Sequence, residues 1–128
     1  MKEKIVITGG AGFIGSKLGY MLAKRGYEVL LLDDLSYGHE YNLTINGDTF
    51  GTFKKIDIRS PELKNYFLGA DCIFHFAAIG TLPVCQKEPV NSIDVNVTGT
   101  VNVLEASRLA NVRRIIFASS GAVYENNT

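Results

Sequence analysis

The sequence predicts an α/β fold, in which helices cover both faces of a doubly wound parallel sheet of about five strands. Three observations lead to this prediction. Short apolar runs recur along the whole chain, stretches with helical apolar spacing separate them, and the first run, Ile5-Val6-Ile7, leads directly into glycines. Strands that alternate with helices are typical of a parallel sheet covered on both faces. Right-handed crossovers then favour the strand order 3-2-1-4-5.

The strands follow from short runs of apolar and β-branched residues. We expect them at residues 4–8, 28–33, 52–57, 72–76 and 114–118. The second run, residues 27–32, is apolar almost throughout, as in a parallel strand that is buried on both faces. Between the second and third strands, residues 35–50 are polar and rich in glycine and asparagine, so we expect a loop there.

The helices follow from apolar periodicity and from end signals. The first is expected at residues 12–25, with Gly26 as a stop signal. A short helix is expected to open at Ser60-Pro61-Glu62, because serine caps helices and proline suits the first helical position. A long helix is expected at residues 89–110. The apolar positions that support the first and the long helix are Phe13, Ile14, Leu18 and Leu22, which share one face, and Ile93, Val97, Val101, Leu104 and Leu109.

The glycine-rich segment Thr8-Gly9-Gly10-Ala11-Gly12-Phe13-Ile14-Gly15 joins the first strand to the first helix. Gly10, Gly12 and Gly15 satisfy the pattern G-x-G-x-x-G. Without a Cβ, the chain can turn tightly, approach a pyrophosphate closely and pack the helix against the strand. The start of the following helix offers unpaired N–H groups to the phosphates. The segment therefore predicts a Rossmann-like dinucleotide site.

Asp33 ends the second predicted strand, 21 positions after Gly12. This is close to the spacing expected of a carboxylate that binds a ribose 2′-hydroxyl. Such a carboxylate would repel a 2′-phosphate, and no Arg or Lys follows within the next few residues. We therefore expect the cofactor to be NAD rather than NADP.

Composition narrows the class of protein. A chain of 128 residues is expected to form a single domain. Its 13 basic and 13 acidic residues cancel, which gives no charge signal for nucleic-acid or membrane binding. No apolar run approaches the length of a membrane span, no signal-peptide core follows the N-terminus, and Cys72 and Cys85 lack the spacing of a metal site. We therefore expect a cytoplasmic protein with no metal.

Taken together, the ordered motifs resemble the N-terminal part of the extended short-chain dehydrogenase/reductase family, in its nucleotide-sugar epimerase and dehydratase branch. The resemblance spans all 128 residues. It is carried by the glycine-rich segment and, in order, by Asp33-Asp34-Leu35-Ser36, Asp57-Ile58, His75-Phe76-Ala77-Ala78, Asn96-Val97-Thr98-Gly99-Thr100 and Ala118-Ser119-Ser120-Gly121-Ala122-Val123-Tyr124.

The resemblance implies a set of NAD-binding residues and one catalytic residue. Ser120 matches the hydroxyl that helps to position the sugar alcohol being oxidised. Asn96 would be a structural polar residue that ties its helix to the fourth strand or to ordered water. The implied cofactor-binding residues are Gly9, Gly12, Phe13, Ile14, Gly15, Asp33, Asp34, Ser36, Asp57, Ile58, Phe76, Ala77, Ala78, Asn96 and Ser119.

The family's activity implies a UDP-glucose 4-epimerase-like reaction. NAD takes a hydride from sugar C4 while a tyrosine takes the hydroxyl proton, and the hydride returns to the other face of the keto-sugar. A 4,6-dehydratase or a uronate decarboxylase shares these N-terminal motifs. A dinucleotide-binding module without catalysis is the alternative from a different class.

The chain departs from the family pattern at its catalytic base, which is a Tyr followed four residues later by Lys. The fourth residue after Tyr124 is Thr128. We therefore expect the chain to lack this pair and the sugar-binding domain, to form a partial NAD-binding domain over residues 1–128, and to be inactive alone. We also expect homo-oligomerisation or self-association, because the fifth strand would leave an uncovered sheet edge.

Overall fold

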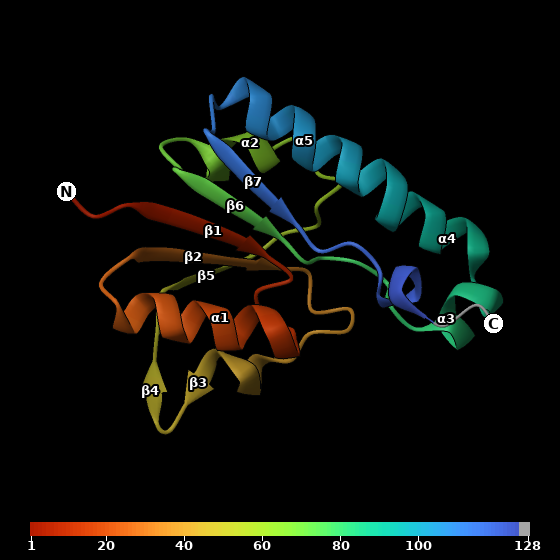
Figure 1. The fold of residues 1–128 in the computed structure, drawn as a ribbon, viewed down its shortest axis with the longest axis horizontal. Coiled ribbons are helices and arrows are strands. Elements are labelled where there is room, and N and C mark those ends of the chain that lie inside the picture. Colours follow the sequence, from red (N-terminus) through yellow and green to blue (C-terminus); the bar gives the residue numbers. More distant parts are fainter. Residues whose placement is uncertain (126–128) are drawn as a thin grey trace.

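A computed structural model describes residues 1–125 of the chain. Five strands pair in parallel in the order β5-β2-β1-β6-β7 (Figure 1). They are β1 (Lys4–Thr8), β2 (Glu28–Asp33), β5 (Thr52–Lys55), β6 (Cys72–His75) and β7 (Arg114–Phe117). Counted within this sheet alone, the order is the predicted 3-2-1-4-5. The labels differ because a small antiparallel hairpin, β3 (Thr44–Ile45) and β4 (Asp48–Thr49), lies in the segment predicted to be a loop.

Helices cover both faces of the sheet, as predicted. Helix α1 (Phe13–Lys24) lies on one face, and α2 (Leu63–Phe67) and α5 (Gly99–Leu109) lie on the other (Figure 1). Alternate residues of the central strands point into two separate clusters of buried apolar side chains, one on each face of the sheet. Val6 packs toward the side of α2 and α5, whereas Ile7 packs toward the side of α1. The nearly continuous apolar strands are thus explained by burial on both faces.

The start of α1 differs from the expectation. Phe13 and Ile14 are exposed rather than sharing a packed face with Leu18 and Leu22. Helix α1 begins shortly after the end of β1, and its first two residues lie on the surface. Close packing comes instead from Gly19, where a Cβ would lie 2.8 Å from the Leu31 Cδ2 atom. The small size of Gly19 allows this contact between helix and sheet, and apolar periodicity gives no signal for it.

The short helix α2 also differs, because it starts at Leu63 rather than at Pro61. The Ser60 hydroxyl accepts a hydrogen bond from the amide of Glu62 at 3.2 Å, and the Ser60 carbonyl accepts one from Leu63 at 3.2 Å. Ser60 therefore closes a turn that precedes the helix.

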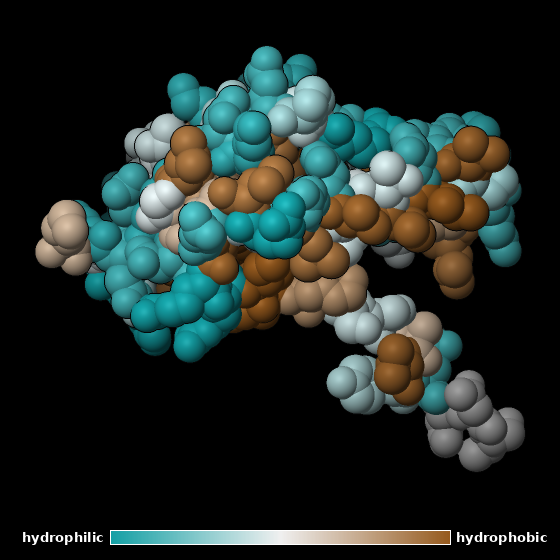
Figure 2. Space-filling model, turned by 90° about the horizontal axis from the view of Figure 1, so that it is seen from above, coloured by the Kyte–Doolittle hydropathy of each residue, from teal (hydrophilic) through white to brown (hydrophobic). Residues whose placement is uncertain are grey.

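The predicted long helix consists of three continuous parts, with a further helix, α3 (Leu82–Lys87), before it. The parts are α4 (Pro89–Ile93), the π-helical turn η2 (Asp94–Thr98) and α5. Its apolar positions Ile93, Val97, Val101, Leu104 and Leu109 are exposed, while Gly99, Val103, Ala106 and Ser107 are buried. Figure 2 shows apolar patches on the arm formed by α3 and α4 at the right of the view.

Strand β7 lies at the sheet edge and, in the described part of the chain, pairs with β6 alone. Ile116 and Phe117 on this strand are 40% and 58% exposed. Two short 3-10 helices complete the elements, η1 (Glu40–Leu43) and η3 (Gly121–Tyr124). Within residues 1–125, no helix combines the length and apolar character that crossing a membrane requires.

Candidate nucleotide-binding site

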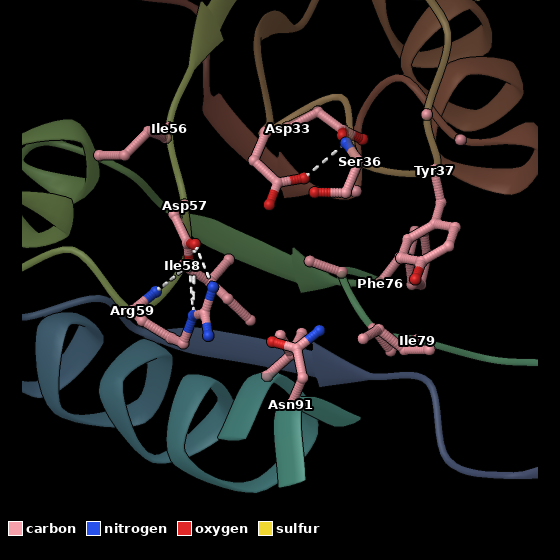
Figure 3. A pocket seen from close by; sticks show the side chains of 17 residues that line it. Asp33, Ser36, Tyr37, Ile56, Asp57, Ile58, Arg59, Phe76, Ile79 and Asn91 are labelled. Atoms are coloured by element: carbon pink, nitrogen blue, oxygen red, sulfur yellow. Dashed lines mark hydrogen bonds and ion pairs between the residues drawn. The ribbon is translucent and has the colours of Figure 1, made fainter. Parts of the chain in front are cut away.

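A cavity of about 330 Å³ opens at the carboxyl ends of β1, β2, β5 and β6. This is the edge of an α/β sheet where ligands bind. Figure 3 shows side chains from the ends of β2, β5 and β6, such as Asp33, Asp57 and Phe76, around this cavity. Its lining residues are Gly9, Gly12, Asp33, Asp34, Ser36, Tyr37, Gly38, Ile56, Asp57, Ile58, Arg59, Phe76, Ala77, Ala78, Ile79, Asn91 and Val95. Ten of the predicted cofactor-binding residues lie on this wall.

The glycine turn meets the end of β6 without room for a side chain. Gly9 has a φ of +71°, and a Cβ there would lie 2.8 Å from the Ala77 backbone nitrogen. A Cβ at Gly15 would collide with the Gly9 carbonyl oxygen. Glycine is therefore required at Gly9 by conformation and by contact, and at Gly15 by contact.

The start of α1 is free of any side-chain cap. Its first three amides, those of Phe13, Ile14 and Gly15, come directly after the cavity residue Gly12 and have no partner within the helix. Such amides together with the helix dipole form an anion-binding site. Phe13, Ile14 and Gly15 themselves are not among the residues that line the cavity, so the cofactor contacts expected of them remain predictions.

Asp33 is buried at the cavity wall, with 9% of its surface exposed. Its Oδ2 accepts a hydrogen bond from the amide of Ala11 at 3.0 Å, and its Oδ1 accepts one from the amide of Leu35 at 2.8 Å. These bonds tie the end of β2 to the glycine turn. They also fix the direction of the carboxylate and leave lone pairs on both oxygens for a ligand.

The loop after Asp33 continues the cavity wall. Leu35 has a φ of +64°, a left-handed conformation that costs energy in a residue with a branched side chain. The backbone amide of Ser36 donates to Asp34 Oδ1 at 2.9 Å. Tyr37 follows and also lines the cavity (Figure 3). Sequence reasoning missed Tyr37, although its place directly after the ribose segment was a usable signal.

A cation that the sequence did not reveal also lines the cavity. Arg59 donates to Asp57 Oδ2 at 2.6 Å and to Asp94 Oδ2 at 2.7 Å. Hydrogen bonding from Arg59 lowers the pKa of the Asp57 carboxyl, and the two carboxylates raise the pKa of Arg59 further. The guanidinium is thus already neutralised by two acidic partners. The Asp57-x-Arg59 spacing was the available signal, but Asp94 comes from a distant helix.

Asn96 does not line the cavity, but it holds a residue that does. Its Oδ1 accepts from the Ile79 amide at 2.8 Å, and its Nδ2 donates to the Ile79 carbonyl at 3.0 Å. Asn96 lies in the π-helical turn η2, as does Asp94, the partner of Arg59. Such turns often occur at functional sites. Asn96 therefore connects the helix to the segment after β6, close to the place expected from the resemblance.

Ser119 and Ser120 are exposed and lie outside the cavity wall. Ser120 Oγ accepts a hydrogen bond from the Ala122 amide at 3.2 Å and so caps η3. The roles proposed for these two serines remain predictions.

The expectation that the chain has no Tyr-x-x-x-Lys spacing is wrong as stated, because Tyr20 and Lys24 have it. Both lie on α1, outside the cavity wall. Tyr20 packs against Phe50 with ring centroids 5.5 Å apart, and Lys24 Nζ pairs with Asp48 at 3.0 Å. Tyr20 and Lys24 therefore contribute to the contact of α1 with Phe50 and with the hairpin, and neither lines the cavity.

Several known proteins are similar to this chain. A UDP-glucose 4-epimerase of Lactobacillus helveticus is 38% identical over 94% of the chain and 36% of its own length. One from Klebsiella pneumoniae is 35% identical over 94% of the chain and 91% of its own length. A UDP-N-acetyl-alpha-D-glucosaminuronate decarboxylase of Bacillus cytotoxicus is 37% identical over the whole chain and 40% of its own length. The chain thus spans well under half the length of most of these relatives.

Solved structures agree with these relatives. The crystal structure of UDP-glucose-4-epimerase from Stenotrophomonas maltophila, with bound NAD and formylated UDP-arabinopyranose, superimposes with a TM-score of 0.88 at 32% identity. The match covers 98% of this chain and 39% of that one. The family described as NAD dependent epimerase/dehydratase matches residues 5–128. With its parallel sheet, glycine turn and acidic second strand end, the chain belongs to the NAD dependent epimerase/dehydratase family.

Proposed function

We propose that the chain binds NAD in the cavity at the strand ends, as the nucleotide-binding part of a UDP-glucose 4-epimerase-like enzyme. One observation carries this proposal: the uncapped start of α1 and the buried Asp33 carboxylate adjoin the same cavity. The first suits phosphates and the second suits a ribose diol.

The residues present fit NAD. At Gly12, which lines the cavity, the missing Cβ would let the backbone approach a pyrophosphate, and at Gly9 the missing Cβ lets the turn pack against Ala77. Asp33 would bind the ribose hydroxyls, with Asp34 and Ser36 beside it. Asp57 and Ile58 would meet the adenine, and the segment from Phe76 to Ala78 would pass along the dinucleotide. Arg59 does not favour a 2′-phosphate, because Asp57 and Asp94 already satisfy its charge.

When bound, NAD supplies an acceptor and donor of hydride for a carbon that carries a hydroxyl. The chain's own contribution is to orient the dinucleotide and, through Ser120, to hold the sugar hydroxyl by a hydrogen bond. Removal of the hydroxyl proton needs a base with a lowered pKa. Neither Tyr124, which lacks a lysine four residues on, nor Tyr20, which lies on α1, is suited to that task.

A second reaction class is favoured by one relative. The Bacillus cytotoxicus decarboxylase is about as similar to this chain as the epimerases are. A uronate decarboxylase or a 4,6-dehydratase would use the same nucleotide site. A binding module without catalysis is the third candidate, and the exposure of Ser120 favours it for the chain alone.

The cofactor is tested by calorimetric titration of the chain with NAD and with NADP. We expect one-to-one binding of NAD and weaker binding of NADP. Replacing Asp33 with Asn should narrow this preference by about 10-fold, because a neutral amide no longer repels the 2′-phosphate. Asp48→Asn removes a carboxylate outside the cavity and should leave the preference unchanged. Equal or tighter binding of NADP by the unmodified chain would refute the proposal.

A further inference from the structure

His75 occupies a buried position behind the cavity wall, at the end of β6. Only 2% of its surface is exposed. Its Nδ1 lies 2.6 Å from the Thr8 hydroxyl and its Nε2 lies 2.9 Å from the Thr100 hydroxyl. The ring also stacks on Phe117, with centroids 5.7 Å apart. The imidazole thus links β1 to α5 at the carboxyl end of β6.

The direction of each hydrogen bond follows from the donors and acceptors present. Thr100 Oγ1 lies 2.6 Å from the Asn96 carbonyl oxygen, which can only accept, so the Thr100 hydroxyl must donate to it. Thr100 Oγ1 is then an acceptor toward His75, whose Nε2 must carry a hydrogen.

The other side of the ring gives the same answer. Thr8 Oγ1 accepts from the amides of Phe76 at 3.1 Å and Ala77 at 3.2 Å. Its own hydrogen therefore points to His75 Nδ1, which accepts it. The opposite tautomer would leave the Thr8 hydrogen without an acceptor. A single neutral form, with hydrogen on Nε2 alone, satisfies every group.

This chain of hydrogen bonds begins and ends at one segment of the cavity wall, residues 76–79. It starts at the amides of Phe76 and Ala77 and passes through Thr8, His75 and Thr100. Asn96 then pairs with both backbone groups of Ile79. The Gly9 backbone packs closely on Ala77, because a Cβ added to Gly9 would lie only 2.8 Å from the Ala77 backbone nitrogen. The ring can therefore set how residues 76–79 lie against the glycine turn.

We propose that His75, held as its Nε2–H tautomer between Thr8 and Thr100, is a positioning residue that fixes the wall 76–79 against the glycine turn for NAD. This inference rests on the proposed NAD site. His75 touches no ligand, because it lies behind the wall and does not line the cavity. It acts through the amides that its partners hold.

The test uses two variants of Thr100. Thr100→Val removes the acceptor of the Nε2 hydrogen, whereas Thr100→Ser keeps the hydroxyl. We expect Thr100→Val to weaken NAD binding about 10-fold, the equivalent of one buried hydrogen bond, and Thr100→Ser to retain it. Calorimetry at pH 7.5 measures the affinity, and circular dichroism checks the fold.

Nitrogen NMR of the imidazole gives a readout that does not depend on NAD. The chain has two histidines, and His39→Gln assigns the signals. His75 should show hydrogen on Nε2 alone in the unmodified chain and in Thr100→Ser, and mixed tautomers in Thr100→Val. A result that would overturn the inference is hydrogen on Nδ1 in the unmodified chain, or unchanged affinity in a folded Thr100→Val.

Amide hydrogen exchange of the unmodified chain keeps the inference testable if Thr100→Val does not fold. The amides of Ala77 and Ile79 should exchange as slowly as those within β6. Fast exchange at both would contradict a wall fixed by His75. Failure of the unmodified chain to bind NAD would instead refute the proposed function, so the two failures are distinguishable.

Discussion

The cavity wall and the strip of residues 117–125, from the end of β7 to η3, both follow the carboxyl ends of strands in the sheet. Their side chains are held very differently. On the wall, Asp33, Asp57 and Arg59 each have two or more hydrogen bonds. In the described part of the chain, no buried side-chain nitrogen or oxygen lacks a partner. Along the strip, every residue from Phe117 to Glu125 is exposed. The wall that we propose to bind NAD is therefore organised in advance, whereas the strip that carries Ser120 is not.

This difference indicates which region of the chain suits binding and which would have to support catalysis. Binding to a rigid, hydrogen-bonded wall requires little ordering of the protein, so affinity for a nucleotide can reside in this chain. Catalysis requires reacting groups within a narrow range of distances. Exposed serines without packing partners do not meet that requirement.

The largest expected effect is on turnover. A protein of these 128 residues, supplied with NAD and UDP-glucose, should show no measurable epimerase or dehydratase activity. A positioned proton-transfer group typically raises the rate by about 10²–10⁴, and we expect this chain to lack one. Ser120 is also exposed and lies outside the cavity wall. A coupled assay for UDP-galactose measures the reaction. Robust turnover by the pure chain would break the division between the two regions.

Gly12→Val tests whether the glycine turn of the cavity wall is the phosphate site. A valine side chain would occupy the space through which the backbone approaches a phosphate. Loss of one or two hydrogen bonds to a charged group costs about 3 kcal/mol, or about 100-fold in affinity for NAD. Gly121→Val, in η3, makes the same substitution in open space and outside the cavity. It should leave the affinity unchanged. If Gly12→Val folds and still binds, the glycine turn is not the phosphate site.

Mild acid should destabilise the organised region through His75. Burial lowers the pKa of His75 to about 4 from its usual 6.5, so the unfolded chain binds a proton in this range that the folded chain does not. The stabilisation is complete above pH 6.5 and is lost as the pH falls toward 4. We expect a loss of about 2 kcal/mol by pH 5.

Urea unfolding at pH 7.5 and pH 5 measures this loss. Thr8, Thr100 and Phe117 surround the ring and carry no charge that could offset it. His39→Gln removes the exposed histidine and should show the same loss. A free energy of unfolding that stays constant between the two pH values would contradict a buried, neutral His75.

The exposed strip predicts a smaller, concentration-dependent effect. Among residues 1–125, strand β7 pairs with β6 alone and exposes Ile116 and Phe117, and such an edge can pair with another chain. Sedimentation over a range of concentrations should show self-association. Ile116→Lys should reduce it, because charges on an edge strand oppose pairing. A clean monomer at high concentration would mean that this edge is protected.

Local signals in the sequence were sufficient for the sheet, and the family resemblance supplied most of the cavity wall. Glycine spacing and the carboxylate at the end of the second strand act within a few residues and indicated Gly12 and Asp33, whereas Asp57 came from the resemblance. What they could not show were contacts made across long separations. Arg59 meets Asp94, and Asn96 meets Ile79, only because the long helix crosses the strand ends.

The sequence also did not reveal which apolar residues of the helices are exposed. Phe13, Ile14 and Val101 have the periodicity of buried positions but lie on the surface. Periodicity identifies an apolar face, and it does not say whether the described chain covers that face. The buried side of α5 is marked instead by small residues such as Gly99 and Ala106.

The central claim, that the cavity binds NAD, is tested most directly by amide NMR of the labelled chain during titration with NAD. The account predicts the largest shifts at Phe13, Ile14 and Gly15, at Leu35 beside the Asp33 carboxylate, and along residues 76–79. Amides of η3 should shift little. Shifts that cluster on β7 and η3, or their absence at the glycine turn when NAD is bound, would contradict it.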